Sequence, residues 1–93
     1  MRIRWTPSAA DDLEHIYDYL TEHESHLARA TVIEIRESIR SLRKFPRSGR
    51  PGIEEGTREL LHRRLPYIVV YRTKDEPIEI LHIWHPSQER PSK

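Results

Sequence analysis

The sequence predicts an α+β fold with the element order β-α-α-β-β-β, in which a helical hairpin packs on one face of a mainly antiparallel four-stranded sheet. Two consecutive stretches between residues 7 and 45 carry apolar residues at helical spacing, which predicts two helices joined by a short link. Later runs between residues 57 and 85 are rich in β-branched and aromatic residues and are separated by turns, which predicts strands. The apolar face of a helical hairpin needs a covering layer, and the sheet supplies it.

Composition sets the limits of the prediction. Ninety-three residues suffice for one domain, which we place at residues 1–86, followed by a polar segment at 87–93 that we expect to be a mobile tail. The chain has no cysteine, so disulfides and thiolate metal sites are excluded. No apolar run approaches the roughly 20 residues that span a bilayer, and Arg2 and Arg4 interrupt the N-terminus before a signal sequence forms. We therefore expect a cytoplasmic protein with no membrane partner.

The net charge of +1 hides a division along the chain. Residues 1–39 contain four Lys and Arg against eight Asp and Glu, whereas residues 40–93 contain twelve against seven. A basic half suits an acidic partner, either nucleic acid or an acidic protein segment. The alternative is a solvated face that binds nothing.

The N-terminal half predicts one strand and two helices. Residues 2–5 alternate polar and apolar, which predicts a short strand whose position in the sheet the pattern leaves open. Thr6 is the expected N-cap of the first helix and Pro7 its first residue, and the helix should end near residues 21–23. A second helix should begin near Ser25 and stop at Phe45-Pro46. The predicted buried stripes are Ala9, Leu13, Ile16, Tyr17 and Leu20 in the first helix, and Ala28, Val32, Ile35, Ile39 and Leu42 in the second.

The C-terminal half predicts a loop and three strands. Residues 46–56 contain all three glycines and are expected to be a loop, whose arginines Arg47 and Arg50 either grip a phosphate or carboxylate or belong to a plain connector. Residues 57–64 predict a strand, and Pro66 is expected to begin the next one. The segment 67–71 has no polar break, which is typical of a central strand. Residues 73–77 predict a turn, and 78–85 the last strand.

Basic and aromatic residues gather at the predicted sheet margin, and this cluster is the main candidate site. Arginine beside aromatic residues can bind phosphates and stack on bases, and a histidine near arginines can act as general acid or base in RNA cleavage. Because side chains alternate along a strand, the cluster is divided between the two faces of the sheet, and its side chains cannot all converge. Alternatively, these side chains only make the sheet edges soluble. The cluster comprises Arg58, Arg63, Arg64, Arg72 and His85, with Tyr67 and Tyr71 interleaved.

Other chemistry has little support. The six histidines lack a metal-ligand pattern, because His23 and His26 lie at a helix junction and His82 and His85 are expected on opposite faces of a strand. The serines have no strained glycine elbow around them, and no phosphate-binding loop is present. We expect neither a metal nor a cofactor.

The order of several motifs resembles the ParE/RelE superfamily of toxins from type II toxin–antitoxin modules, from about residue 3 to residue 86. The fold that this resemblance implies agrees with the one derived from the patterns. The segments that carry it are Thr6-Pro7-Ser8-Ala9, Asp12-Leu13, Ile16-Tyr17-Asp18-Tyr19-Leu20, Phe45-Pro46-Arg47-Ser48-Gly49-Arg50-Pro51-Gly52, Thr57-Arg58-Glu59-Leu60, Leu65-Pro66-Tyr67-Ile68-Val69-Val70-Tyr71-Arg72 and Ile78-Glu79-Ile80-Leu81-His82-Ile83-Trp84-His85.

The resemblance implies one of two activities. RelE-like members are metal-independent ribonucleases that cut mRNA on the ribosome, and in that case the catalytic residues here would be Arg58, Arg64 and His85. ParE-like members inhibit DNA gyrase and lack that set. Ile68 stands where several RelE-like sequences carry an arginine, and Pro86 rather than tyrosine follows His85. These departures favour the ParE branch, while an inactive module that only binds an antitoxin is a third alternative.

The resemblance also implies partners. A cognate antitoxin would wrap the domain in a hetero-oligomer, and the target would be DNA gyrase or, in the alternative, the ribosome and its mRNA. An acidic peptide that folds on binding suits a basic surface. The residues expected to bind the target or the antitoxin are Arg47, Arg50, Arg58, Arg63, Arg64, Tyr67, Arg72 and His85.

Overall fold

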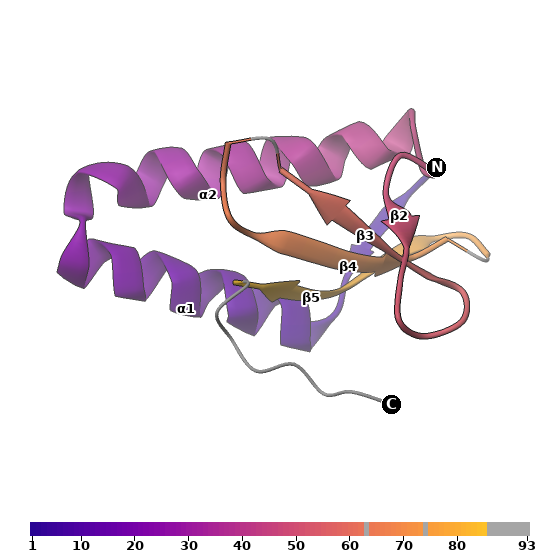
Figure 1. Ribbon diagram of the computed structural model, residues 1–93, viewed down its shortest axis with the longest axis horizontal. Helices are drawn as coiled ribbons and strands as arrows, with labels where there is room; N and C mark the ends of the chain where they lie inside the picture. Colours follow the sequence, from indigo (N-terminus) through magenta and orange to yellow (C-terminus); the bar gives the residue numbers. More distant parts are fainter. Residues whose placement is uncertain (63, 74, 86–93) are drawn as a thin grey trace.

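The computed structural model describes residues 1–62, 64–73 and 75–85 and confirms the α+β class. Arg63 and the predicted tail at 87–93 lie outside the described residues. Two antiparallel helices run side by side and pack on a mixed sheet (Figure 1). The elements are β1 (Ile3–Trp5), α1 (Pro7–His23), α2 (Ser25–Arg40), the 3₁₀ helix η1 (Ser41–Arg43), β2 (Arg50–Pro51), β3 (Thr57–Leu61), β4 (Ile68–Arg72) and β5 (Ile78–Trp84).

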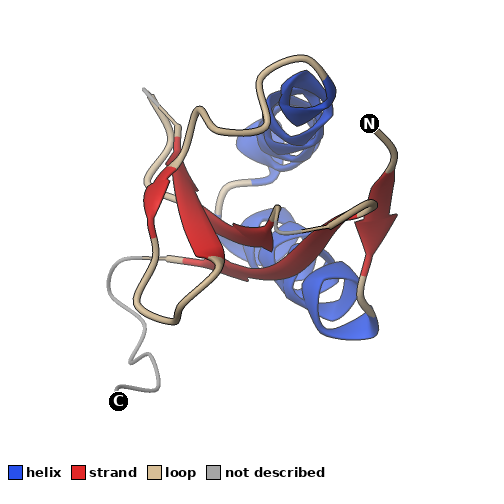
Figure 2. Cartoon of the chain, turned by 90° about the vertical axis from the view of Figure 1, so that its right-hand side faces the viewer, coloured by secondary structure: helices blue, strands red, loops and turns tan. Residues whose placement is uncertain are grey.

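The sheet has five strands in the order β1-β5-β4-β3-β2, one strand more than predicted. β4 is central, as its unbroken apolar run predicted. β1 pairs in parallel with β5 and forms one edge of the sheet, and the remaining pairs are antiparallel. Figure 2 shows β1 at this edge, next to the N-terminus. The helical hairpin carries the chain from β1 at one edge of the sheet to β2 at the other.

Two predicted strand boundaries and one loop assignment were wrong. β3 ends at Leu61 rather than at residue 64, and β4 begins at Ile68 rather than at Pro66. The segment 46–56 is not only a loop, because β2 pairs there with β3. A ladder of two residues has no periodicity of its own, so only its pairing with a distant strand reveals it.

The start of α1 follows the local prediction. Thr6 has an extended backbone with φ −76° and ψ 158°, its Oγ1 accepts a hydrogen bond from the Ala9 N–H at 3.2 Å, and Pro7 occupies the first turn. The same hydroxyl donates to the Ile80 carbonyl at 2.7 Å. Thr6 therefore caps the helix and also fixes it to β5.

One core lies between the helices and the sheet, and both predicted stripes contribute to it. Tyr17 was wrongly assigned to the stripe of α1: it is 45% exposed, because it lies to one side of the row that faces the sheet. The core comprises Ala9, Leu13, Ile35, Ile39, Leu42, Tyr67, Val69, Tyr71, Ile78, Ile80 and Ile83, with Ile3, Trp5, Ile16, Val32, Leu60 and Leu65 packed partly against it. In the described part of the chain, neither helix has the length and apolar character needed to cross a membrane.

Candidate recognition surface

The strand register separates the three residues that a ribonuclease would need. Arg58 lies opposite Tyr71, near the end of the sheet where Thr57 pairs with Arg72. Arg64 and His85 lie beyond the opposite end, where Leu61 pairs with Ile68 and Ile68 with Trp84. Three residues of strand, about 10 Å, separate Arg58 from Leu61. The structure therefore does not gather Arg58, Arg64 and His85 at one point.

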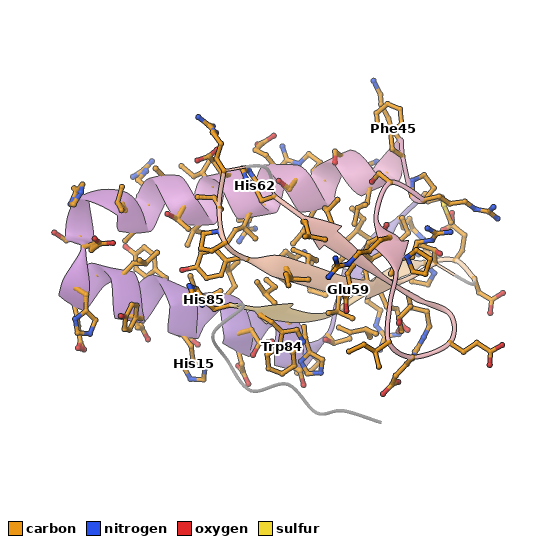
Figure 3. The ribbon with its side chains drawn as sticks, in the orientation of Figure 1. His15, Phe45, Glu59, His62, Trp84 and His85 are labelled. Carbon is orange, nitrogen blue, oxygen red and sulfur yellow. The ribbon has the colours of Figure 1, made fainter. Side chains whose placement is uncertain are left out.

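Arg50 pairs with a buried carboxylate. It lies in β2 opposite Glu59, whose Oε1 accepts from Arg50 Nε at 3.1 Å and from Nη2 at 2.8 Å. Glu59 is only 4% exposed and sits where β2 meets β3 (Figure 3). A buried carboxylate needs a partner for its charge. Arg50 therefore compensates an internal charge, and only part of its guanidinium is accessible.

Arg58 and Tyr71 hold the loop that precedes β2. Arg58 Nη1 donates to the Gly49 carbonyl at 2.7 Å and to the Arg47 carbonyl at 3.4 Å. The buried Tyr71 hydroxyl accepts from the Gly49 N–H and donates to the Pro46 carbonyl, both at 2.9 Å. The side chain of Arg58 therefore positions the loop, while Arg47 is exposed.

Arg64 joins the loop between β3 and β4 to the second helix. Its Nη2 forms an ion pair with Glu34 Oε1 of α2. His62 lies beside this pair, with Nε2 3.7 Å from the same oxygen, and its Nδ1 accepts from the Arg64 and Leu65 N–H groups at 3.1 Å. The side chain of Arg64 is 78% exposed, so it remains accessible in addition to its pairing.

Arg72 shares one carboxylate with an arginine of the first strand. Glu79 Oε1 lies 3.5 Å from Arg72 Nη1, and Glu79 Oε2 lies 3.2 Å from Arg4 Nη1. This network crosses β1, β5 and β4 on the face of the sheet opposite the core residues Tyr71 and Ile80. Exposed pairs of this kind contribute little to stability, about 0–1 kcal/mol.

Tyr67 and His85 make an aromatic contact within the predicted site. Their rings meet edge to face with centroids 5.5 Å apart, at the end of β5 beside α1 (Figure 3). Both line a hollow of about 590 Å³ together with Asp12 and His15. Burial raises the pKa of the Tyr67 hydroxyl above its usual value of 10.0, and the nearby Tyr19 and Glu24 side chains raise it further.

Sequence reasoning missed Asp12, which fastens the first helix to the last strand. Its Oδ2 accepts from the Ile83 N–H at 3.0 Å and lies 3.3 Å from His82 Nδ1. The His82 ring in turn stacks on Trp84 with centroids 4.8 Å apart. No local pattern distinguishes Asp12 from its exposed neighbour Asp11, so only the docked helix reveals this role.

It also missed a row of arginines that runs along α2 into η1. Arg36, Arg40 and Arg43 recur at spacings of four and three residues, which places them on one side of a helix. They line a hollow together with Arg2 and Trp5 at the β1 edge. Across the described ranges, no group of three or more His, Asp and Glu side chains could hold a metal ion.

The fold places the chain in a class of small α+β domains. In this class a helical hairpin covers one face of a mixed sheet, and here several arginines lie at the sheet edges. The model of the ParE toxin of type II toxin–antitoxin systems, of the parDE type, matches residues 3–90. The chain belongs to the ParE toxin family.

Two relatives agree with this assignment. A candidate toxin of Sinorhizobium fredii (strain NBRC 101917 / NGR234), Y4kP, is 38% identical over 90 residues, which is 97% of this chain and 93% of the relative. A solved structure described as the chromosomal ParDE toxin–antitoxin system from P. aeruginosa superposes with a TM-score of 0.81 at 34% identity. That alignment covers 89% of this chain and 92% of the other.

Proposed function

We propose that this toxin arrests growth by inhibiting DNA gyrase through protein–protein contact and that a cognate antitoxin neutralises it. The observation that carries the proposal is the match to the ParE family over residues 3–90, because inhibition of gyrase is the activity that resemblance to ParE-like toxins implies. Such contact needs no cofactor, and it takes place in the cytoplasm, where gyrase acts.

The arginines of the sheet margin support binding over catalysis. Arg50 is engaged by Glu59, Arg58 by the Gly49 carbonyl and Arg64 by Glu34. Arginines fixed by internal partners form a rigid surface, and a rigid surface loses little conformational entropy when a partner binds. The target-binding role of Arg47, Arg63, Tyr67, Arg72 and His85 remains part of the same proposal.

Purified toxin and gyrase test the target directly. We expect supercoiling of relaxed plasmid to fall as the toxin approaches stoichiometry with gyrase, and we expect no cleavage of mRNA in a purified translation mixture. The second experiment uses the protein encoded by the reading frame beside the toxin gene. This protein should bind the toxin and restore supercoiling. Codon-positioned cuts in ribosome-bound mRNA with unimpaired supercoiling would reverse the proposal.

A ribonuclease is the second candidate, and one observation favours it. His85 contacts the Tyr67 ring at the hollow that Asp12 and His15 also line, so an acid or base stands beside a cavity large enough for part of a nucleotide. The register places Arg58 away from this hollow, which leaves fewer cations to stabilise the phosphorane charge. If neither assay responds and expression is harmless, the remaining role is that of an inactive antitoxin-binding module.

A further inference from the structure

A strip of positive charge lies at the edge formed by β1 and the C-terminal end of α2, away from the predicted sheet-margin site. Two hollows of about 400 and 520 Å³ lie there, and both are lined by Arg40 and Arg43. In Figure 1 the N-terminus and β1 lie beside the end of α2, which brings Arg2 next to the helix. The cations that line the two hollows are Arg2, Arg36, Arg40, Arg43 and Lys44, and we call them the cationic strip.

Few carboxylates compensate the charge of the cationic strip. Among the described residues, Arg40 has one exposed contact with Glu37, at 3.5 Å, and the rest of the strip forms no ion pair. Glu37 is the one carboxylate among the described residues that line the two hollows. Glu76 also lies near, where it accepts from the backbone N–H of Arg2 at 3.3 Å. The excess of positive charge favours an anionic partner.

The cations of the strip are accessible and lie on a rigid part of the fold. All of them are exposed, while Ile39 and Leu42, which alternate with them along the chain, are buried in the core. The row from Arg36 to Lys44 extends about 12 Å along the helix axis. Duplex DNA carries one phosphate charge for about every 1.7 Å of its axis, so a row of this length faces several phosphates.

The strip offers little apolar surface to a partner. Ile39 is 2% exposed, and Trp5 is half-buried with the Arg36 guanidinium 5.9 Å from its ring centroid. The more apolar hollow along Leu13 and Val32 shares only Trp5 and Arg36 with the strip. An amphipathic peptide binds through apolar anchors, whereas a phosphate backbone needs cations whose planar donors bind phosphate oxygens in pairs. The strip therefore fits a nucleic-acid backbone better than a peptide.

We propose that the cationic strip binds the phosphate backbone of duplex DNA. Contacts to phosphates carry no sequence information directly, so this binding has no sequence preference. The inference goes beyond the proposed function, because the toxin alone carries the strip, whatever its protein target is. It also bears on that function: a toxin that holds DNA while it contacts gyrase has two linked contacts, and linked contacts raise the effective affinity.

Fluorescence anisotropy with a labelled DNA duplex of about 20 base pairs tests the strip. We expect wild-type toxin to bind with a dissociation constant in the micromolar range at about 50 mM salt. The variant Arg36→Gln with Arg40→Gln should bind at least tenfold more weakly. Its slope of log K against log salt should be smaller by about 2, one unit for each phosphate contact that is lost.

Arg29→Gln is the matched control for Arg40→Gln. Both arginines are exposed, both lie on α2 and each substitution removes one charge, but Arg29 lines neither hollow. Arg40→Gln should weaken DNA binding about three- to tenfold, whereas Arg29→Gln should stay within about twofold of wild type. Circular dichroism and thermal unfolding establish that each variant is folded. Equal DNA affinity of wild type and the strip variants would overturn the proposal.

Trp5 reports on the site directly. In a Trp84→Phe background it is the only remaining indole, and its fluorescence should change when the duplex binds, because Arg36 lies over its ring. No change in a toxin that binds the duplex would place the DNA elsewhere and overturn the assignment.

Polyglutamate of the same total charge tests the class of ligand. We expect it to bind at least fivefold more weakly than the duplex, because the duplex has the higher charge density and releases condensed counterions. Equal affinity for the two probes, lost together in the strip variant, would identify a site for acidic peptides and would replace the DNA proposal.

The outcomes separate the inference from the proposed function. If wild-type toxin inhibits supercoiling but does not bind the duplex, the inference is wrong and gyrase inhibition stands. If the toxin binds DNA through the strip but does not inhibit supercoiling, the inference stands and the proposed target fails. If both hold, the Arg36→Gln, Arg40→Gln toxin should still inhibit gyrase but should require at least fivefold more protein. Equal potency would overturn the linked contact with gyrase.

Discussion

Tyr71 stabilises the fold through its hydroxyl as well as its ring. The side chain is fully buried, and the hydroxyl satisfies the Gly49 N–H and the Pro46 carbonyl. A Cβ placed on Gly49 would lie 2.7 Å from that hydroxyl and 2.8 Å from the Glu59 carbonyl. Glycine is therefore required at 49 for space, and the loop before β2 is fixed by one tyrosine.

Tyr71→Phe should lower the free energy of unfolding by about 1–3 kcal/mol, because it leaves the two backbone groups without their partner. Urea denaturation measures the loss. Tyr17→Phe is the matched control, since the Tyr17 side chain is exposed and the change should stay within about 0.5 kcal/mol. Equal stability of the two variants would show that water replaces the Tyr71 hydroxyl.

Tyr67 makes stability depend on pH in the alkaline range. Its pKa in the folded protein is raised above 10.0, mainly by burial. Between the unfolded and the folded pKa the native state holds a proton that the unfolded state has lost, so the free energy of unfolding falls as pH rises. The contribution of Tyr67 to the free energy of unfolding is complete below pH 10, and it is lost as the pH rises past the pKa of Tyr67 in the folded protein.

The wild type should therefore lose more stability between pH 9 and pH 11.5 than Tyr67→Phe does, measured by urea denaturation at each pH. In an ultraviolet titration of the folded proteins, Tyr67→Phe should lack part of the absorbance change that the wild type shows above pH 10. A Tyr67→Phe variant with the same alkaline slope as the wild type would contradict the assignment.

At the scale of elements, two polar residues of the N-terminal segment join α1 to β5. Thr6 donates to the Ile80 carbonyl, and Asp12 accepts from the Ile83 N–H. Between these points the register of β4 and β5 shifts at Val70 and Tyr71, and Leu81 is the extra residue on β5. A strand irregularity leaves backbone groups without ladder partners, and the Thr6 hydroxyl also donates to the Leu81 carbonyl at 3.3 Å, so the helix start satisfies a backbone group there.

Asp12→Ala should destabilise the protein by about 1–3 kcal/mol, because the Ile83 N–H loses its acceptor. Asp12→Asn should retain most of the stability, since an amide oxygen can accept the same hydrogen bond. Asp11→Ala, at the exposed neighbouring position, serves as the control. Thermal and urea unfolding measure the stability of the three variants. If Asp12→Ala and Asp12→Asn lose the same stability, the charge of Asp12 rather than its hydrogen bond stabilises the protein.

At the scale of the whole molecule, folding pairs some arginines of the basic half of the chain with carboxylates. Arg64 pairs with Glu34 of the acidic half, while Arg50 and Arg72 pair with carboxylates near them in the sheet. Among the described residues, cations without an ion-pair partner come from both halves, for example Arg2 and Arg36 from the first and Arg43 from the second. The division of charge along the sequence is therefore a poor guide to charge on the surface.

His85→Ala should leave toxicity and gyrase inhibition largely intact, because His85 is one of several contacts in the proposed binding surface and binding needs no acid or base. Growth after induction and supercoiling in vitro are the measurements, and retained antitoxin binding establishes that the variant is folded. Near-complete loss of toxicity in a folded, antitoxin-binding His85→Ala protein would argue for the ribonuclease.

The sequence by itself determined the helices, the central strand, the Thr6 cap and the family, because periodicity, capping and motif order are local properties of the chain. Tertiary structure decided the rest. The parallel pairing of β1 with β5, the partner of Arg64 and the hollow at Trp5 depend on residues far apart in the sequence, while β2 and the pair of Arg50 with Glu59 depend on two strands packing edge to edge. Such contacts leave no local pattern, since each partner's position is fixed only when the sheet and the helical hairpin pack together.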